Sequence, residues 1–353
     1  MRFRKANDLV GLDIGSAMVK VAEVSTSSKG KTLKHFGAMA LRPEAIEDGI
    51  IQDPQHVTDV IHEVFSRNRI RNQNVALSIG GYSAVIKRIS MPTMADDALQ
   101  KNILVEAEQY IPFDINDVSI DYQVIDSGAQ AQGSGYMNIM LVAAKKDLIA
   151  QYVNVVEAAG LLPSLVDVDA FAIQNIHEAI HGVMPNETIL LHVGANKMSM
   201  NMVKNGHSVF MRDVSMGSQQ INARIRALTG CTDEEAEELK LTGFGKGMSE
   251  QNFADIVAQV TGQWCAEVVK AVDFFTSTSP SERVNELVLS GGGAHLERFI
   301  EALTMQTGFR VSVLNPFTGV NINPEQFDVN YIQKMAPQAV VAMGLALRKM
   351  EDK

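Results

Sequence analysis

A carboxylate and a glycine lie where an apolar alternation pauses near the start of the chain. Asp13 and Gly15 precede the pause at Ser16 and Ala17, and Val19 resumes the period of two that is typical of a strand. We therefore expect a β-hairpin. Glycine lets the backbone approach an anion, turn amides can point at that anion, and a carboxylate can hold Mg²⁺ through water. The segment predicts a phosphate-binding turn; an exposed turn without a ligand is the alternative.

A second segment repeats this arrangement in the other half of the chain. The apolar run 188–193 leads into Gly194 and Ala195, and another strand is expected over 199–203. The Asn-Gly pair at 205–206 then favours a type I′ turn into the next strand. Two such units in one chain indicate duplicated halves that face a common cleft.

Three consecutive glycines, Gly291, Gly292 and Gly293, separate a strand expected over 287–290 from a helix that passes through Leu296. A run of glycines raises the entropy cost of folding, and the sequence suggests no packing use for it. Backbone lying flat against a ligand, with a helix N-terminus directed at a phosphate, accounts for such a run. A tight strand-to-helix turn is the structural alternative.

Length and composition limit the remaining possibilities. The 353 residues exceed what one hydrophobic core usually supports, so two domains or four smaller subdomains are expected. Strand and helix patterns alternate along the chain, which is typical of α/β architecture. The net charge of −10 and the lack of a basic stripe argue against nucleic acid as a partner. Cys231 and Cys265 lack metal-ligand spacing, and we find no secretory signal and no apolar run long enough to cross a bilayer.

The region 85–163 has a different order of expected elements, a helix, a hairpin and a second helix, and is expected to form a compact insertion. A helix with Thr93 as its candidate cap leads into a hairpin whose small-residue turn spans 127–135. A second helix then closes at Gly160. Such an appended unit is suited to docking a partner.

Taken in order, the three glycine segments resemble the phosphate 1, phosphate 2 and adenosine motifs of the actin, Hsp70 and sugar-kinase superfamily. The matching residues are 11–16, 191–195 and 289–294. The segments 167–170 and 339–346 are similar to the two connecting motifs. The resemblance covers nearly the whole chain, and it implies an α/β, actin-like ATPase fold with two RNase H-like halves around a nucleotide cleft.

The insertion is similar to subdomain 1C of FtsA-like proteins, and the segments 106–113 and 121–124 resemble the type IV pilus assembly protein PilM family. These resemblances imply a division of the chain into subdomains. The expected parts are 1A over 1–84 and 164–186, 1C over 85–163, and a second half over 187–353, with 2B at about 217–284 and a C-terminal helix over 337–350 packing back on 1A.

The resemblance to that family implies a cytoplasmic, ATP-binding scaffold at the inner face of the inner membrane, in the type IV pilus assembly complex. The family binds the cytoplasmic N-terminal peptide of PilN in a groove that involves 1A and 1C. Nucleotide state is a further factor expected to modulate this binding. Other pilus assembly proteins, including motor ATPases, and self-association are further expected contacts. The membrane is expected to be reached only through partners.

The superfamily motifs also imply roles for individual residues. Asp13 is expected to face Mg²⁺ and the phosphates, and Lys20 to face the phosphates. Glu237 and Lys240, one helical turn apart, are expected to contact the adenosine of ATP or ADP. A solvated lysine and a surface ion pair are the respective structural alternatives. The backbone around the nucleotide is expected to come from Gly15, Ser16, Ala17, Met18, Gly194, Ala195, Gly291, Gly292 and Gly293.

His192 occupies the phosphate 2 position, where the superfamily pattern has an acidic residue. Imidazole is a poor ligand for Mg²⁺, which puts hydrolysis in doubt. Asp169 is the remaining candidate for a base that orients water, although capping of the helix expected over 170–179 is the simpler role. We therefore expect a nucleotide-binding adaptor with slow hydrolysis or none. An FtsA-like filament and a small-molecule kinase are the alternatives.

Overall fold

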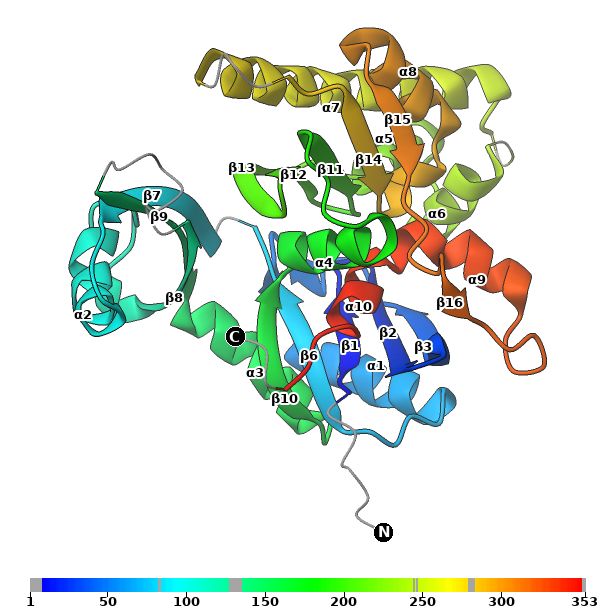
Figure 1. The fold of residues 1–353 in the computed structure, drawn as a ribbon. Helices are drawn as coiled ribbons and strands as arrows, with labels where there is room; N and C mark the ends of the chain where they lie inside the picture. The colour runs from blue at the N-terminus through cyan, green and yellow to red at the C-terminus, as the bar shows by residue number, and fades with distance from the viewer. Residues whose placement is uncertain are drawn as a thin grey trace.

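The computed structural model describes residues 8–81, 84–126, 135–243, 245, 247–278 and 283–350. It has two halves, each built on one sheet, and a smaller unit at one side (Figure 1). The first sheet has the strand order β10-β6-β1-β2-β3-β16. Its strands are β1 Val10–Ile14, β2 Met18–Ser27, β3 Gly30–Ala40, β6 Asn74–Ile79, β10 Leu162–Val168 and β16 Val320–Asn321.

The second sheet repeats the arrangement of the first around its central strand. Its order is β13-β12-β11-β14-β15. β1 pairs antiparallel with β2 and parallel with β6, and β11 likewise pairs antiparallel with β12 and parallel with β14. The expected duplication is therefore confirmed. The strands are β11 Thr188–Val193, β12 Met198–Lys204, β13 His207–Val214, β14 Glu286–Ser290 and β15 Arg310–Val313.

Helices cover both faces of the first sheet and the outer face of the second. Helices α1 and α3 share one core with the first sheet, while α4 and α10 lie between the two sheets. Helices α5 to α8 pack on the second sheet from outside. The bounds are α1 Pro54–Arg67, α3 Lys146–Ala158, α4 Asp169–His181, α5 Gln219–Thr229, α6 Asp233–Thr242, α7 Glu250–Thr278, α8 Glu297–Thr307, α9 Val329–Met335 and α10 Val340–Leu345.

Two glycines let backbone meet backbone in the layer between the two sheets. A Cβ on Gly344, in α10, would collide with the carbonyl oxygen of Ala172, in α4. A Cβ on Gly11, in β1, would collide with the carbonyl oxygen of Ala342. Because both collisions involve main-chain atoms, side-chain rearrangement cannot relieve them. These contacts hold β1, α4 and α10 at close distance.

The small unit is a three-stranded sheet, β7-β9-β8, covered on one face by α2. Its elements are α2 Asp96–Ala107, β7 Ala84–Pro92, β8 Val118–Asp126 and β9 Tyr136–Lys145. The insertion predicted over 85–163 is too long. Leu148 and Val156, on the buried face of α3, belong to the core of the first half, so the unit ends at Lys145.

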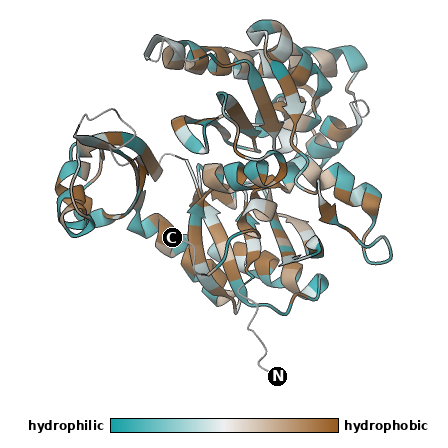
Figure 2. Ribbon diagram, viewed as in Figure 1, coloured by the Kyte–Doolittle hydropathy of each residue, from teal (hydrophilic) through white to brown (hydrophobic). Residues whose placement is uncertain are grey.

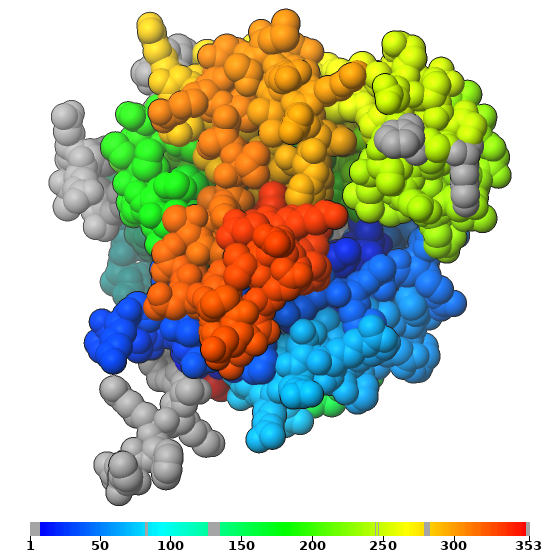
Figure 3. Space-filling model, turned by 90° about the vertical axis from the view of Figure 1, so that its right-hand side faces the viewer, coloured from blue at the N-terminus to red at the C-terminus, as the bar shows by residue number. Residues whose placement is uncertain are grey.

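The C-terminal part of the chain that packs on the first half begins before residue 337, the start that was predicted for it. Strand β16 pairs with β3, and the ring of Phe317 lies edge-on to Phe36 at 5.5 Å between centroids. Residues of α9 and α10 join the same core. The helix predicted over 337–350 is wrong in extent, because a 3₁₀ turn, Ala336–Gln338, precedes α10 and α10 ends at Leu345. In Figure 3 this orange-to-red segment lies across both halves.

The region predicted as subdomain 2B, 217–284, contains α5, α6 and α7, together with residues outside the described ranges. Apolar side chains of these helices share one core with the second sheet, and Trp264 packs edge-on to Phe299 at 5.1 Å. Figure 2 shows hydrophobic residues concentrated on the strands and polar residues on the outer helices. No helix within the described ranges is both long and apolar enough to span a bilayer.

Most local expectations are confirmed, and one cap is wrong. The Asn-Gly turn has positive φ at Asn205 (50°) and Gly206 (76°), as a type I′ turn requires. Thr93 does not cap α2, which starts at Asp96. Instead the Thr93 N–H donates to the Gly135 carbonyl at 2.8 Å and extends the β7–β9 pairing. The turn expected over 127–135 lies, apart from Gly135, outside the described residues.

Replacing Gly344 with alanine tests the close approach of α10 and α4. We expect Gly344→Ala to lower the free energy of unfolding by about 2–3 kcal/mol, because overpacking against backbone cannot relax. Gly262→Ala is the matched control: no atom lies within 4 Å of a Cβ there. In helix α7 this change should stabilise by about 0.5–1 kcal/mol. Urea unfolding measures both, and equal midpoints would contradict the packing argument.

Candidate functional site

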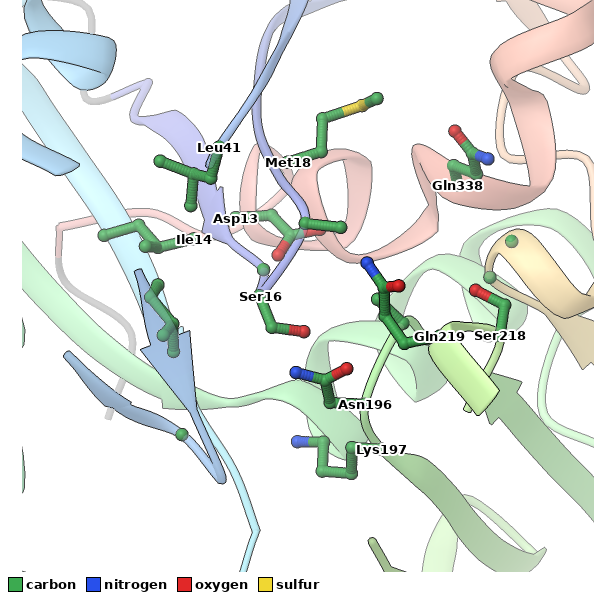
Figure 4. Close-up of a pocket in the computed structure, with 18 of the residues that line it drawn as sticks. Asp13, Ile14, Ser16, Met18, Leu41, Asn196, Lys197, Ser218, Gln219 and Gln338 are labelled. Atoms are coloured by element: carbon green, nitrogen blue, oxygen red, sulfur yellow. The ribbon is translucent and has the colours of Figure 1, made fainter. Parts of the chain in front are cut away.

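Two hairpins reach into one cavity between the halves (Figure 4). In the first, the Gly15 N–H donates to the Met18 carbonyl at 3.1 Å. In the second, the Gly194 N–H donates to the Lys197 carbonyl at 2.8 Å. The same bond thus closes both turns. The hairpins predicted from the two glycine segments are present and directed at a shared space.

The cavity has a volume of about 700 Å³ and opens between the second half and the first. Figure 3 shows a recess beside the C-terminal segment, between the yellow-green helices and the blue strands. A volume of this size suits a drug-sized ligand or nucleotide. It is lined by every residue predicted for nucleotide binding except Gly293: Asp13, Gly15, Ser16, Ala17, Met18, Lys20, Gly194, Ala195, Glu237, Lys240, Gly291 and Gly292.

Gly293 lies behind the cavity and not in its wall. A Cβ there would lie 2.6 Å from Cβ of Val193 and 3.5 Å from the Trp264 ring, so packing demands glycine. Gly291 has φ 83°, and its N–H donates to the Pro337 carbonyl at 2.7 Å. The expectation that the glycine run has no packing use is wrong for these two. A Cβ on Gly292 has no closer neighbour than a side-chain nitrogen at 3.5 Å, so Gly292 alone fits that expectation.

Glu237 and Lys240 form an ion pair on the cavity wall. The Lys240 Nζ lies 2.7 Å from Oε2 of Glu237, and the Asn222 side-chain amide donates to the same oxygen at 2.7 Å. The Lys240 side chain is only 12% exposed. Helix α6 carries the pair, and a capping box of Thr232 and Glu235 fixes where this helix begins. The pair therefore lines the cavity with Lys240 largely buried and Glu237 46% exposed.

Asp13 and Lys20 are opposite each other in the β1–β2 pairing and form a buried ion pair. Their side chains lie 2.8 Å apart, and each is 11% exposed. Burial raises the pKa of Asp13, and the attraction and hydrogen bond of Lys20 offset only part of that rise. Lys20 is thus not the solvated lysine of the structural alternative.

Asp169 is the first residue of α4, but its side chain does not cap that helix. Its two oxygens are engaged elsewhere: Lys197 donates to Oδ2 at 2.6 Å, and the Ser78 hydroxyl donates to Oδ1 at 2.6 Å. Burial alone would raise the pKa of Asp169, yet Lys197 and Ser78 together hold it below its usual value. Gly80 makes room for the pair, because a Cβ there would collide with the Lys197 ammonium and the Asp169 carboxylate.

Lys197 is the residue that sequence reasoning missed. It stands three positions after Gly194, at the end of the second turn, where a lysine looks like an ordinary solvated side chain. Asp169 and Asp213 raise the pKa of Lys197 above its usual value, although burial opposes them. The only signal in the sequence is its position in a turn that resembles a phosphate motif.

His192 is paired in register with Ser290 in the neighbouring strand, and its Nδ1 lies 3.0 Å from the Ser290 Oγ. Burial lowers the pKa of His192 to about 4, although the Asp169 carboxylate opposes this. The imidazole is therefore neutral at pH 7. It supplies neither the charge nor the oxygen ligands of the carboxylate that the superfamily pattern has here.

The residues fit a nucleotide but not a resident divalent cation. Mg²⁺ prefers carboxylate and water oxygens, and the carboxylates of Asp13 and Asp169 are each paired with a lysine. Across the described ranges, no three Asp, Glu, His or Cys side chains come together as a metal site. The Asp13 carboxylate, which was predicted to hold Mg²⁺ through water, is engaged by Lys20 in this structure.

Comparison with known proteins identifies the family. The family model described as type IV pilus assembly protein PilM matches residues 11–350. This chain belongs to the PilM family. The match spans both halves and the small unit, as the resemblance in the motifs implies.

Solved structures agree on the fold. A chain of a PilM–PilN type IV pilus biogenesis complex has a TM-score of 0.87 at 24% identity, with 98% of this chain and 99% of that chain covered. The ethanolamine utilization protein EutJ from Carboxydothermus hydrogenoformans gives 0.57 at 15% identity, over 96% and 89%. MreB5 of Spiroplasma citri, bound to AMPPNP, gives 0.50 at 12% identity, over 95% and 94%. The predicted actin-like fold is confirmed.

The buried imidazole makes the stability of this PilM-family chain sensitive to acid. Because the folded-state pKa of His192 is about 4, below the ordinary 6.5, the unfolded state takes up the proton first as pH falls. Stability is lost between those two values, on the order of 2–3 kcal/mol. We expect His192→Asn to remove the His192 share of this loss in urea unfolding across pH 4–7, while His177, whose pKa burial also lowers to about 4, keeps its own share. His62→Asn, on the exposed face of α1, is the control; parallel curves for wild type and His192→Asn would contradict the assignment.

Proposed function

We propose that this chain is a nucleotide-binding scaffold of the type IV pilus inner-membrane assembly complex, acting at the cytoplasmic face. The observation that carries the proposal is the pair of matched hairpins facing one cavity in a chain of the PilM family. One solved structure similar to this chain is a PilM–PilN complex, and another, MreB5, has AMPPNP bound.

The cavity offers a place for each part of ATP or ADP. Backbone at Gly15 and Gly194 leaves space for phosphates between the hairpins, and Lys20 brings a positive charge to the same space. Glu237, Lys240, Gly291 and Gly292 line the same cavity, which supports the proposal that Glu237 and Lys240 contact the adenosine. The side chains of Lys20, Glu237 and Lys240 place a few polar groups in the cavity wall, as specific ligand recognition requires.

The same geometry favours binding over hydrolysis. A general base works best with a pKa near the operating pH. Asp169 departs from this in two ways, because its pKa is lowered and both of its oxygens accept short hydrogen bonds. His192 is neutral and bonded to Ser290. We therefore propose an adaptor with slow ATP turnover or none.

Substitution of two lysines that form similar ion pairs tests nucleotide binding. Lys240 and Lys270 each pair with a glutamate three residues earlier, at 2.7 and 2.6 Å, but only Lys240 lines the cavity. We expect Lys240→Met to weaken ADP and ATP binding about tenfold, which corresponds to about 1.4 kcal/mol. Lys270→Met should leave affinity unchanged. Isothermal titration calorimetry measures both; equal affinities would reject the proposed adenosine contact.

The sheet face of the small unit opposite α2 is apolar and only partly buried at Ile86 and Val142, which suits an apolar peptide. Residues alternate between faces along a strand, so Ile139 and Leu141 pack under α2 while Ile86 and Val142, paired in register, lie on the opposite face. In Figure 1 this face of the small unit is turned toward the first half. We propose that the N-terminal peptide of a PilN-like protein docks there, between 1C and 1A. Motor ATPases and self-association stay predictions.

Peptide docking is tested by the same change on the two faces of the small unit. We expect Ile86→Glu to weaken binding of a synthetic PilN N-terminal peptide at least about tenfold, since a charge replaces apolar contact. Val105→Glu, at a 66% exposed position on α2, is the control and should bind like wild type. Fluorescence polarisation, with and without ADP, reports affinity and its dependence on nucleotide. Normal binding by Ile86→Glu would move the docking site elsewhere.

A further inference from the structure

The cleft contains one ammonium group from each hairpin. Lys20 follows the first turn and is paired with Asp13, and Lys197 ends the second turn and is paired with Asp169. The two lysines occupy different positions in their hairpins, because Lys20 lies opposite Asp13 in the strand pairing whereas Lys197 belongs to the turn itself. Lys20 lies beside the carboxylate that the superfamily motifs direct at a metal ion, and Lys197 lies beside the carboxylate that is the candidate to orient water.

The pair at Lys197 is built into the fold. The Asp169 carboxylate receives the Ser78 hydroxyl on its other oxygen, and Gly80 leaves the space that both side chains occupy. Asp213, on β13, accepts the Gly81 N–H at 2.8 Å and adds a further negative charge near the lysine. The Lys197 side chain is 28% exposed to the cavity, so its ammonium keeps access to a ligand.

A divalent cation has two tasks in such a cleft: to neutralise phosphate charge and to join the phosphates to the protein carboxylates. An ammonium beside a carboxylate can perform both, because it keeps donors for phosphate oxygens while one donor holds the carboxylate. In this chain Asp13 and Asp169 are each paired with a lysine. The phosphate 2 position, which is acidic in the superfamily pattern, holds the neutral His192.

We propose that Lys197, together with Lys20, takes the place of the divalent cation, so that the chain binds the phosphates of a nucleoside diphosphate or triphosphate without magnesium. The inference rests on the proposed nucleotide binding. It assigns Lys197 as a phosphate-binding residue that the glycine motifs do not indicate.

The experiment measures ADP and ATP affinity by calorimetry, once in excess MgCl₂ and once in EDTA. For the wild type we expect affinities that agree within about threefold, because the lysines already supply the charge. For Lys197→Thr we expect about tenfold weaker binding in EDTA and recovery in MgCl₂, since Asp169 is then free to ligate the ion. Lys204→Thr is the control: it lies on β12, is paired with Glu187, and does not line the cavity.

Circular dichroism would show whether Lys197→Thr folds normally, and a second variant tests the inference independently. Gly80→Ala retains both charges but displaces their flexible ends, so it should show the same new dependence on magnesium. Wild type that binds nucleotide only with MgCl₂ would overturn the inference and leave the proposed function intact. Wild type that binds under neither condition would reject the proposed function itself. If both variants bind without magnesium like wild type, Lys197 has no phosphate role.

Discussion

The contact of α10 with β1 and α4 is the constraint on which the rest of the structure depends. Gly11 and Gly344 remove side chains at the two places where main chains meet. Helix α4 begins at Asp169, beside the cavity, and the turn before α10 accepts the Gly291 N–H through the Pro337 carbonyl. These contacts therefore connect the first hairpin, through β1, with α4 at the cavity and with the glycine loop.

Charge pairing inside the cleft is the second constraint. Burying a single carboxylate or ammonium is costly, and even a paired charge contributes little net stability. The cleft nevertheless holds Asp13 with Lys20 and Asp169 with Lys197, all of them largely removed from water. A fold selected for stability alone would place apolar residues here. These pairs are consistent with a site shaped for an anionic ligand, at some expense in stability.

Local patterns predicted the elements better than their assignment to subdomains. The apolar patterns of β11, β12 and β14 and the turn at Asn205 were sufficient to predict each element. Periodicity shows that a helix has a buried face but not which core receives it. That is why α3 was assigned to the insertion, although its apolar face packs on α1 and the first sheet. The same limit explains why the return of β16 and α9 to the first half was missed.

The sequence by itself determined the three glycine turns, their order and the family, because these depend on local backbone freedom and spacing. The place of Asp13 and Lys20 at the cavity could also be predicted from the sequence, since both residues belong to one hairpin. Only the tertiary structure decided that Lys197 meets Asp169, that Gly293 serves packing, and that both carboxylates of the cleft are already paired. These facts join residues far apart in the chain, and long-range contacts arise only when the two halves pack together.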